Sequence, residues 1–272
     1  MKSELSLLAI FAHPDDEAFG TGGTLAKYAA EGIQVSLLTA TRGEAGQISD
    51  PNLATPENLS TVREQELRCA CQIMGVTNLE VLGYLDGQLA SCDPHEVEGK
   101  IVRVIRRYRP QVMITFGPDG IYGHPDHVAV HHFAKAAFYS SGVASAFPEH
   151  LAEGLRPHAV SKLYYRALPK SNLAILEKSR GSLQIELNGQ ILRFQGMDEE
   201  QITTVIDISA YLETKKAAIQ CHRTQLPPEG RFARLSEQEQ RQWLSQEHFI
   251  LAESRLPLGR GGKETDLFAG LR

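Results

Sequence analysis

The sequence predicts an α/β protein with a Rossmann-like fold, in which helices cover both faces of a mostly parallel sheet. Strand-like and helix-like segments alternate through residues 6–140, as they do where helices connect parallel strands. The first strand-like segment, residues 6–12, is continuously apolar, which indicates a strand buried on both faces. A hairpin signal and further helical patterns follow, and they predict a C-terminal extension that contains a β-hairpin and helices.

Several elements of the first half carry their own boundary signals. Gly32 and Gly75 each follow a helical segment, where many helices end on a left-handed residue. Pro125 opens another helix at a position where its missing N–H costs nothing. We therefore expect strands at residues 6–12, 35–41, 79–83 and 112–116, and helices at residues 18–31, 59–74, 96–108 and 125–140.

The regular alternation ends near Ala144. Asn188-Gly189 lies between two alternating runs and is the strongest short hairpin signal in the chain. We expect one domain over residues 1–272, with a Rossmann-like core at 1–142 and a variable portion at 143–272. That portion should contain strands at 162–168 and 203–208, helices at 210–222 and 237–247, and a loosely held tail or lid in the last dozen residues.

The composition limits the classes of partner. The chain has 272 residues, 42% of them hydrophobic, and a formal net charge of −5, which does not favour a nucleic-acid partner. The apolar stretch near the N-terminus is too short for a membrane span or a signal peptide, so we expect a cytoplasmic protein. In that compartment we expect reduced, mostly buried thiols at the four cysteines, Cys69, Cys71, Cys92 and Cys221.

Two similar phrases follow two of the predicted strands: His-Pro-Asp-Asp at 13–16 and His-Pro-Asp-His at 124–127. Ligands of open parallel sheets bind beyond the carboxyl ends of the strands. His13 and Asp16 are spaced to share one side of a helical turn, so both can hold one ion while Asp15 stays free. With His127 as a third ligand, the set is that of a catalytic zinc site with an open position.

Other interpretations of these residues remain open. A histidine at a helix start can simply cap the helix, and the acids of a first turn suit the helix dipole, which is also the expectation for Glu17. The glycines of residues 20–24 lack a full dinucleotide-binding pattern, so we expect Gly20, Gly22 and Gly23 to allow close helix packing. His131 is expected to lie in or near the core and His132 on the surface.

The chain resembles the PIG-L/LmbE-like family of zinc-dependent de-N-acetylases over most of its length. The resemblance is carried by "AHPDDE" (12–17), "TRGEAG" (41–46), "REQEL" (63–67), "YLDG" (84–87) and "GHPDH" (123–127), with a weaker match at "KKAAIQCHRTQ" (215–225). Members of this family deacetylate N-acetylglucosaminyl intermediates in phosphatidylinositol-anchor, mycothiol and bacillithiol synthesis.

The resemblance implies a role for each matching residue. It makes His13, Asp16 and His127 the metal ligands, in agreement with the spacing, and Asp15 the general base. His124 would stabilise or protonate the transition state as an imidazolium, Tyr122 would lean over the metal, and Arg63 would contact the sugar. Tyr122 and Arg63 also have plainer interpretations, as a packing residue and as a helix-surface charge.

Four further residues are candidates near this site. Asp126 could orient His124 or cap its own helix. Arg42 and Glu44 could brace a loop by pairing with each other, and both could contact the substrate. His222 is either a substrate contact or a structural residue.

The function expected from these residues is removal of the N-acetyl group from an N-acetylglucosamine-type amino-sugar conjugate, with Zn²⁺ as the cofactor. Fe²⁺ or another divalent transition metal would fit the same ligands. The alternatives are an amidase that cleaves a larger acyl group or a thiol conjugate, and, more remotely, a metal- or nucleotide-binding module without turnover. The partner is a small molecule, and a homo-oligomer is consistent with the family.

Overall fold

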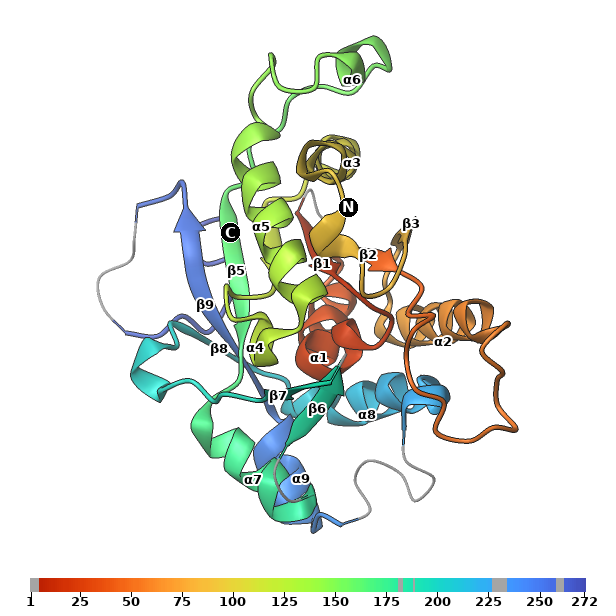
Figure 1. The fold of residues 1–272 in the computed structure, drawn as a ribbon. Coiled ribbons are helices and arrows are strands. Elements are labelled where there is room, and N and C mark those ends of the chain that lie inside the picture. The colour runs from red at the N-terminus through yellow and green to blue at the C-terminus, as the bar shows by residue number, and fades with distance from the viewer. Residues whose placement is uncertain (1–4, 181–182, 188, 227–233, 258–261) are drawn as a thin grey trace.

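A seven-stranded mixed sheet forms the centre of the molecule (Figure 1). The computed structural model describes residues 5–180, 183–187, 189–226, 234–257 and 262–272. The strand order is β3-β2-β1-β4-β5-β9-β8; the first five are parallel, and β9 runs antiparallel to both of its neighbours. The strands are β1 (Ser6–Phe11), β2 (Gln34–Thr41), β3 (Asn78–Tyr84), β4 (Val112–Thr115), β5 (Lys162–Ala167), β8 (Thr204–Asp207) and β9 (Gln246–Ser254).

Strand β1 lies at the centre of the parallel part and pairs with β2 on one side and β4 on the other. All its residues are buried, so both faces of the sheet are covered there. The chain winds from β1 toward β3 in one direction and from β4 toward β5 in the other. The connections that follow β1 and β4 therefore lead away in opposite directions, and the carboxyl ends of these two strands form the crevice in which ligands bind in such sheets.

Two groups of helices cover the sheet. Helices α1, α2 and α8 contact one another, and α3 contacts α5 (Figure 1). Shorter segments and a separate two-stranded hairpin, β6–β7, complete the fold. The bounds are α1 (Asp16–Ala30), α2 (Leu59–Met74), α3 (Pro94–Tyr108), α4 (Gly120–Gly123), α5 (Pro125–Ser140), α6 (Glu149–Ala152), α7 (Lys170–Arg180), α8 (Leu212–Cys221), α9 (Glu237–Leu244), β6 (Gln184–Leu187) and β7 (Gln190–Arg193).

The predicted α/β class and every predicted strand are confirmed, with boundaries shifted by a few residues. The hairpin forms where Asn188-Gly189 predicts it, although residue 188 itself lies outside the described residues. Helix α7 and strand β9 were not predicted, and neither were the short helices α4 and α6. The helix predicted at 237–247 ends at Leu244, because the chain then enters β9 and fills the gap between β5 and β8.

The prediction of a loose C-terminal tail is wrong for residues 262–272. Leu267 and Phe268 are fully buried. Glu264 accepts hydrogen bonds from Lys162 Nζ (2.7 Å) and Tyr164 Oη (2.6 Å), both on β5. The sequence did not predict that this segment packs against the rest of the protein, because Leu267 and Phe268 are its only fully buried apolar side chains within the described residues. Residue 261 lies outside the described residues.

The prediction of reduced cysteines is wrong for one pair. Cys69 of α2 and Cys221 of α8 form a disulfide across 152 positions of sequence. Helices α2 and α8 pack side by side and bring the two Cα atoms to 5.9 Å, within bridging distance. Cys71 and Cys92 are free thiols.

The glycines of α1 allow close approach, as the sequence predicts. A Cβ atom on Gly23 would lie 2.6 Å from Ile208 Cδ1, next to β8. His131 is buried and hydrogen bonds the Phe116 carbonyl oxygen at 3.0 Å, while His132 is exposed, and both agree with expectation. No helix in the described part of the chain is long and apolar enough to span a membrane.

Candidate metal centre

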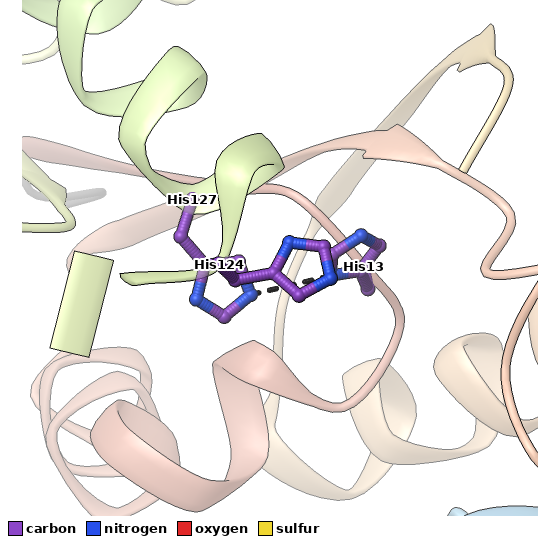
Figure 2. A group of neighbouring side chains, drawn as sticks. All are labelled: His13, His124 and His127. Atoms are coloured by element: carbon purple, nitrogen blue, oxygen red, sulfur yellow. Dashed lines mark hydrogen bonds between the residues drawn. The ribbon is translucent and has the colours of Figure 1, made fainter. Parts of the chain in front are cut away.

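The loops after β1 and β4 meet, and three buried side chains converge there. His13 Nδ1 lies 3.2 Å from His127 Nε2 (Figure 2). The Asp16 carboxylate lies beside both nitrogens, with Oδ1 3.3 Å from His127 Nε2 and Oδ2 3.6 Å from His13 Nδ1. The structure thus brings together the three side chains that the sequence assigns as metal ligands.

Local hydrogen bonds hold the loop after β1 in place. The His13 backbone N–H donates to Asp16 Oδ2 at 2.9 Å and orients this carboxylate toward the two histidines. Asp15, just before α1, adopts a left-handed conformation with φ of 111°, which is costly for a residue with a Cβ atom. Glu17 Oε2 accepts the Asp15 backbone N–H at 2.9 Å and stabilises this conformation.

The second loop is held by the start of α5. Gly120 and Ile121 have positive φ values of 56° and 71°, and they turn the chain back toward the first loop. His124 Nδ1 accepts the backbone N–H of Asp126 at 3.2 Å, so His124 does cap the helix. His127 then lies in the first turn of α5, where its ring stacks on Phe116.

The hydrogen-bond partners of the two histidines leave two lone pairs facing each other. His127 Nδ1 donates to the Gly120 carbonyl oxygen at 3.1 Å, which leaves Nε2 unprotonated in the neutral ring. His13 Nε2 lies 3.0 Å from Asp86 Oδ1 and 3.2 Å from Asp126 Oδ2, so in the neutral ring, the form that binds a metal, the proton belongs on Nε2 and the lone pair on Nδ1. Such partners on the far nitrogen are typical of metal-ligating histidines.

This donor set fits a divalent transition metal. Two nitrogens bound to zinc at about 2.0–2.1 Å in tetrahedral geometry lie about 3.4 Å apart. His13 Nδ1 and His127 Nε2 are 3.2 Å apart, and the Asp16 oxygens lie at similar distances from them. Imidazole and carboxylate are ligands that both Zn²⁺ and Fe²⁺ accept.

The electrostatics of the loops favour a bound positive charge. Burial lowers the pKa of His127 to about 3. Burial alone would lower the pKa of His13 too, but its hydrogen bonds to Asp126, Asp16 and Asp86 raise it well above the usual value. Burial likewise opposes ionisation of Asp16, yet the neighbouring His127 and His13 hold its pKa below the usual range. The acids therefore stabilise a cation at this point.

His124 forms one wall of the same centre. Its ring centroid lies 4.8 Å from that of His13, and the three histidines place nitrogens within 4.8 Å of one another (Figure 2). Burial and the adjacent charge of His13 lower the pKa of His124. This shift is opposite to the expected imidazolium, because a cationic neighbour disfavours a second positive charge. A neutral His124 can still donate a hydrogen bond through Nε2.

Asp15 stands beside the ligands with one oxygen paired to Arg63. Arg63 Nη2 donates to Asp15 Oδ2 at 3.2 Å, and the Asp15 side chain is 20% exposed. Burial raises the pKa of Asp15 to about 6, although the charge of Arg63 opposes the rise. A carboxylate with a pKa close to neutrality, next to a metal site, suits proton transfer.

The Asp126 carboxylate contacts the ring of His13, not that of His124. Besides its contact with His13, its carboxylate accepts the backbone N–H groups of Gly87 (2.7 Å) and Leu89 (3.0 Å). It is fully buried, and it ties the loop after β3 to the ligand loop. The expected contact with His124 is thus replaced by one with a metal ligand.

Asp86 is a further residue of the site, in contact with His13, for which the sequence predicts no role. It lies at the end of β3 and forms a second group of possible metal ligands with His13 and Asp126. The motif at 84–87 contains Asp86, but nothing local shows that its carboxylate turns back toward His13.

Two of the four expected substrate contacts, Arg63 and His222, are buried and bonded to other groups of the protein. Arg63 is 3% exposed, and its guanidinium donates to the carbonyl oxygens of Gly43 (2.7 Å) and Pro14 (2.5 Å) besides Asp15. His222 is fully buried, with Nε2 2.6 Å from Glu17 Oε1. Glu17 is therefore a buried partner of His222, not only an acid at the helix start.

Arg42 and Glu44 do not pair with each other. Arg42 Nε donates to Glu64 Oε2 at 2.7 Å, which directs its side chain along α2. Glu44 Oε1 accepts the Asp86 backbone N–H at 3.0 Å. Glu44 Oε2 is buried without a hydrogen-bond partner in the described structure.

Tyr122 covers the ligands from the side of the hairpin. Its ring meets that of His127 edge-on at a centroid distance of 5.1 Å and stacks on Phe194 at 4.6 Å. Phe194 directly follows β7, so the hairpin and the second loop together build one side of the site.

Comparisons with known proteins show the family of this chain. Residues 8–138 match the PIG-L family model, described as GlcNAc-PI de-N-acetylase. A relative from Catenulispora acidiphila, "1D-myo-inositol 2-acetamido-2-deoxy-alpha-D-glucopyranoside deacetylase 2", is 36% identical over 98% of this chain and 97% of its own length.

Solved structures share the fold at lower identity. N,N'-diacetylchitobiose deacetylase from Pyrococcus horikoshii is 22% identical, with a TM-score of 0.68 over 90% of this chain and 83% of its own. A 4-carboxy-2-hydroxymuconate hydratase from Pseudomonas putida is 18% identical, with a TM-score of 0.66 over 94% of this chain and 100% of its own. These two likenesses show the fold alone, whereas the 36% identity across nearly the whole chain shows the family. The chain belongs to the PIG-L family.

Proposed function

We propose that this protein hydrolyses the acetamide of an N-acetylglucosamine-type conjugate, releasing acetate and the free amine. The observation that carries the proposal is Asp15, an unligated carboxylate beside the group His13, Asp16 and His127. The curated relative at 36% identity is named as a deacetylase of a 2-acetamido-2-deoxyglucopyranoside of myo-inositol, which supports this substrate class.

We assign the ligand positions to His13, Asp16 and His127, with Zn²⁺ as the metal and Fe²⁺ as the alternative. When bound, such a cation supplies Lewis acidity, which lowers the pKa of water and polarises an acyl carbonyl group. His13 is held for this purpose by Asp86 and Asp126, and Asp16 by the His13 backbone N–H.

The protein's own groups would move the protons. Asp15 takes a proton from the attacking water as its oxygen bonds to the acyl carbon. It then gives a proton to the amide nitrogen as the carbon–nitrogen bond breaks, so that acetate and amine leave. His124, as a neutral donor, and Tyr122 stabilise the negative charge that develops on the acyl oxygen. Arg63 positions Asp15, since it bonds both the carboxylate and the Pro14 carbonyl oxygen.

A rival within the same family is an amidase for a larger acyl group or a thiol conjugate. It would use the same residues, and it differs only in what the crevice admits. A binding module without turnover is less consistent with Asp15, because metal storage needs no free carboxylate at the metal. The cytoplasmic location remains a prediction, and the Cys69–Cys221 disulfide weighs against it.

The direct experiment measures acetate and amine released by the metal-loaded protein. The substrates are 1D-myo-inositol 2-acetamido-2-deoxy-α-D-glucopyranoside and the same sugar with a butanoyl or hexanoyl group. Preference for acetyl supports the deacetylase, and preference for a longer chain supports the amidase. Absence of turnover on all of them, in a protein that holds one metal per chain, would contradict the proposal.

A further inference from the structure

Arg166, at the end of β5, has no acidic partner. Within the described parts of the chain, no carboxylate lies within ion-pair distance of its guanidinium, and no acceptor lies within hydrogen-bond distance. The nearby acids are already engaged, since Asp16 lies against His13 and His127, and Asp15 against Arg63. Burial lowers the pKa of Arg166, although the charges of Asp16 and Glu247 oppose this shift.

The protein is nevertheless shaped around this guanidinium. A Cβ atom on Gly20 would overlap the Arg166 guanidinium, so this group packs directly against α1. On the other side, Arg166 Cζ lies 5.8 Å from the Phe116 ring centroid. The guanidinium thus lies between α1 and the Phe116 ring.

Arg166 also lines a cavity of about 70 Å³. Its walls include Phe19, Gly20, Ile121, Arg166 and Phe194. A single water needs about 10–15 Å³ of such space, so the cavity accommodates a group the size of a carboxylate or phosphate.

The charges around the cavity sum to a positive excess. Lys215 also lines it, but Lys215 Nζ is paired with Glu247 Oε1 at 2.7 Å. Glu247 in turn accepts the backbone N–H groups of Gly23 (3.0 Å) and Thr24 (2.7 Å), so it has little capacity left for Arg166. His248, a further wall residue, has its pKa lowered to about 4 by burial and is neutral near pH 7.

The cavity adjoins the metal centre. Gly20 follows Asp16 by four residues on α1, so the two share one face of the helix about one turn, or 5.4 Å, apart. Ile121 precedes Tyr122 in the second loop. A substrate whose acetamide lies at the metal centre would thus bring a neighbouring substituent to Arg166.

We propose that Arg166 binds an anionic group, a carboxylate or a phosphate, on the part of the substrate next to the N-acetylated sugar. This inference rests on the proposed deacetylase function and narrows its substrate class. A planar guanidinium can bind such oxygens through two parallel hydrogen bonds. The anionic group would thus supply the ion-pair partner that Arg166 lacks among the described residues. The inositol conjugate named for the relative carries no such charge, so the two proteins would differ in substrate.

The test uses three N-acetylglucosaminides with one linkage, whose aglycones are hydroxyethyl, carboxymethyl and phosphoethyl. For the metal-loaded protein we expect kcat/KM to be about 10- to 100-fold higher on at least one anionic glycoside than on the neutral one, mainly through KM. The two anionic arms separate carboxylate from phosphate. In Arg166→Met this preference should disappear, and Arg166→Lys should retain part of it. Arg107→Met, which removes an exposed arginine paired with Glu80 on the outside of α3, is the matched control and should keep the full preference.

A second pair of variants tests the placement of the guanidinium without removing it. Gly20→Ala forces it aside and should reduce the preference, whereas Gly22→Ala has only an ordinary contact, 3.4 Å from Met74 Sδ, and should not. Equal kcat/KM on all three glycosides, or the same preference in Arg166→Met, would overturn the inference. If no glycoside is turned over, the proposed function fails. Calorimetric binding of the neutral and anionic glycosides to wild type and Arg166→Met then still decides the role of Arg166.

Discussion

His222 Nε2 lies 2.6 Å from Glu17 Oε1 in the interior, although 205 positions separate the two residues. The other oxygen of Glu17 accepts the backbone N–H of Asp15. The contact therefore connects the end of α8 to the strained residue that we propose as the general base. It explains how a histidine without access to substrate can still matter for the site.

Replacing His222 by leucine should leave Oε1 of the buried Glu17 carboxylate without its imidazole partner. We expect the free energy of unfolding in urea to fall by about 1–3 kcal/mol. In Glu17→Gln/His222→Leu the buried charge is gone, so the loss should be smaller than the sum of the two single effects. Strictly additive single effects would show that the pair is not coupled.

Asp15→Asn should separate proton transfer from metal binding. Asparagine keeps the size of the side chain but cannot accept the proton, so kcat should fall by about 10²- to 10⁴-fold. The metal content should stay at the wild-type value, because Asp15 is not one of the proposed ligands. Acetate release and metal analysis on the same preparation make the comparison. Full activity in this variant would remove Asp15 from the mechanism.

The disulfide between Cys69 and Cys221 should contribute measurably to stability. Closing a loop of this length restricts the unfolded chain, and Cys69→Ser should lower the free energy of unfolding by about 2–5 kcal/mol. Cys71→Ser, which changes a neighbouring free thiol on the same helix, is the matched control for the missing bridge. Four titratable thiols in the unreduced, unfolded protein would contradict the pairing.

Stability should fall as the pH drops below about 6.5, and His248 should account for part of the slope. Burial and the adjacent Lys215 lower its pKa to about 4. Above the unfolded value near 6.5 both states are neutral; below it the unfolded chain takes up a proton that the folded chain resists. The loss should level off near pH 4 at about 1–3 kcal/mol.

His248→Gln removes this titration. Urea unfolding at pH 7.5 and pH 5 should therefore show a smaller difference for His248→Gln than for wild type. The other histidines with lowered pKa values, among them His131 and His158, remain in both proteins and cancel in the comparison. An unchanged difference would show that His248 titrates normally in the folded state.

The parallel half of the fold could be predicted because its signals are local. Continuous apolar strands, a glycine after a helix and a proline at a helix start each act over a few residues, and helices α2 and α5 have the expected bounds. Strand β9 could not be predicted in the same way. Its pairing partners, β5 and β8, are distant in sequence, and its polar residues become buried only because other elements cover them.

In the site, too, local patterns could be predicted and contacts between distant segments could not. His13, Asp16 and His127 were predictable, because a repeated phrase after two strands implies that the loops meet. The partners of Arg63 and His222 could not be predicted. Both side chains bond to residues that are far away in the sequence, Gly43 and Glu17. Asp86 was missed for a related reason: its carboxylate acts on His13, which is distant along the chain.

The metal content of the purified protein decides whether His13, Asp16 and His127 hold a divalent ion. After dialysis against metal-free buffer and addition of Zn²⁺, elemental analysis should find one ion per wild-type chain. His13→Ala and Asp16→Ala should each retain a small fraction of it, while His132→Ala, an exposed histidine on α5, should retain it all. A wild-type chain that binds no divalent ion, or variants of His13 and Asp16 that bind as much as wild type, would contradict the account.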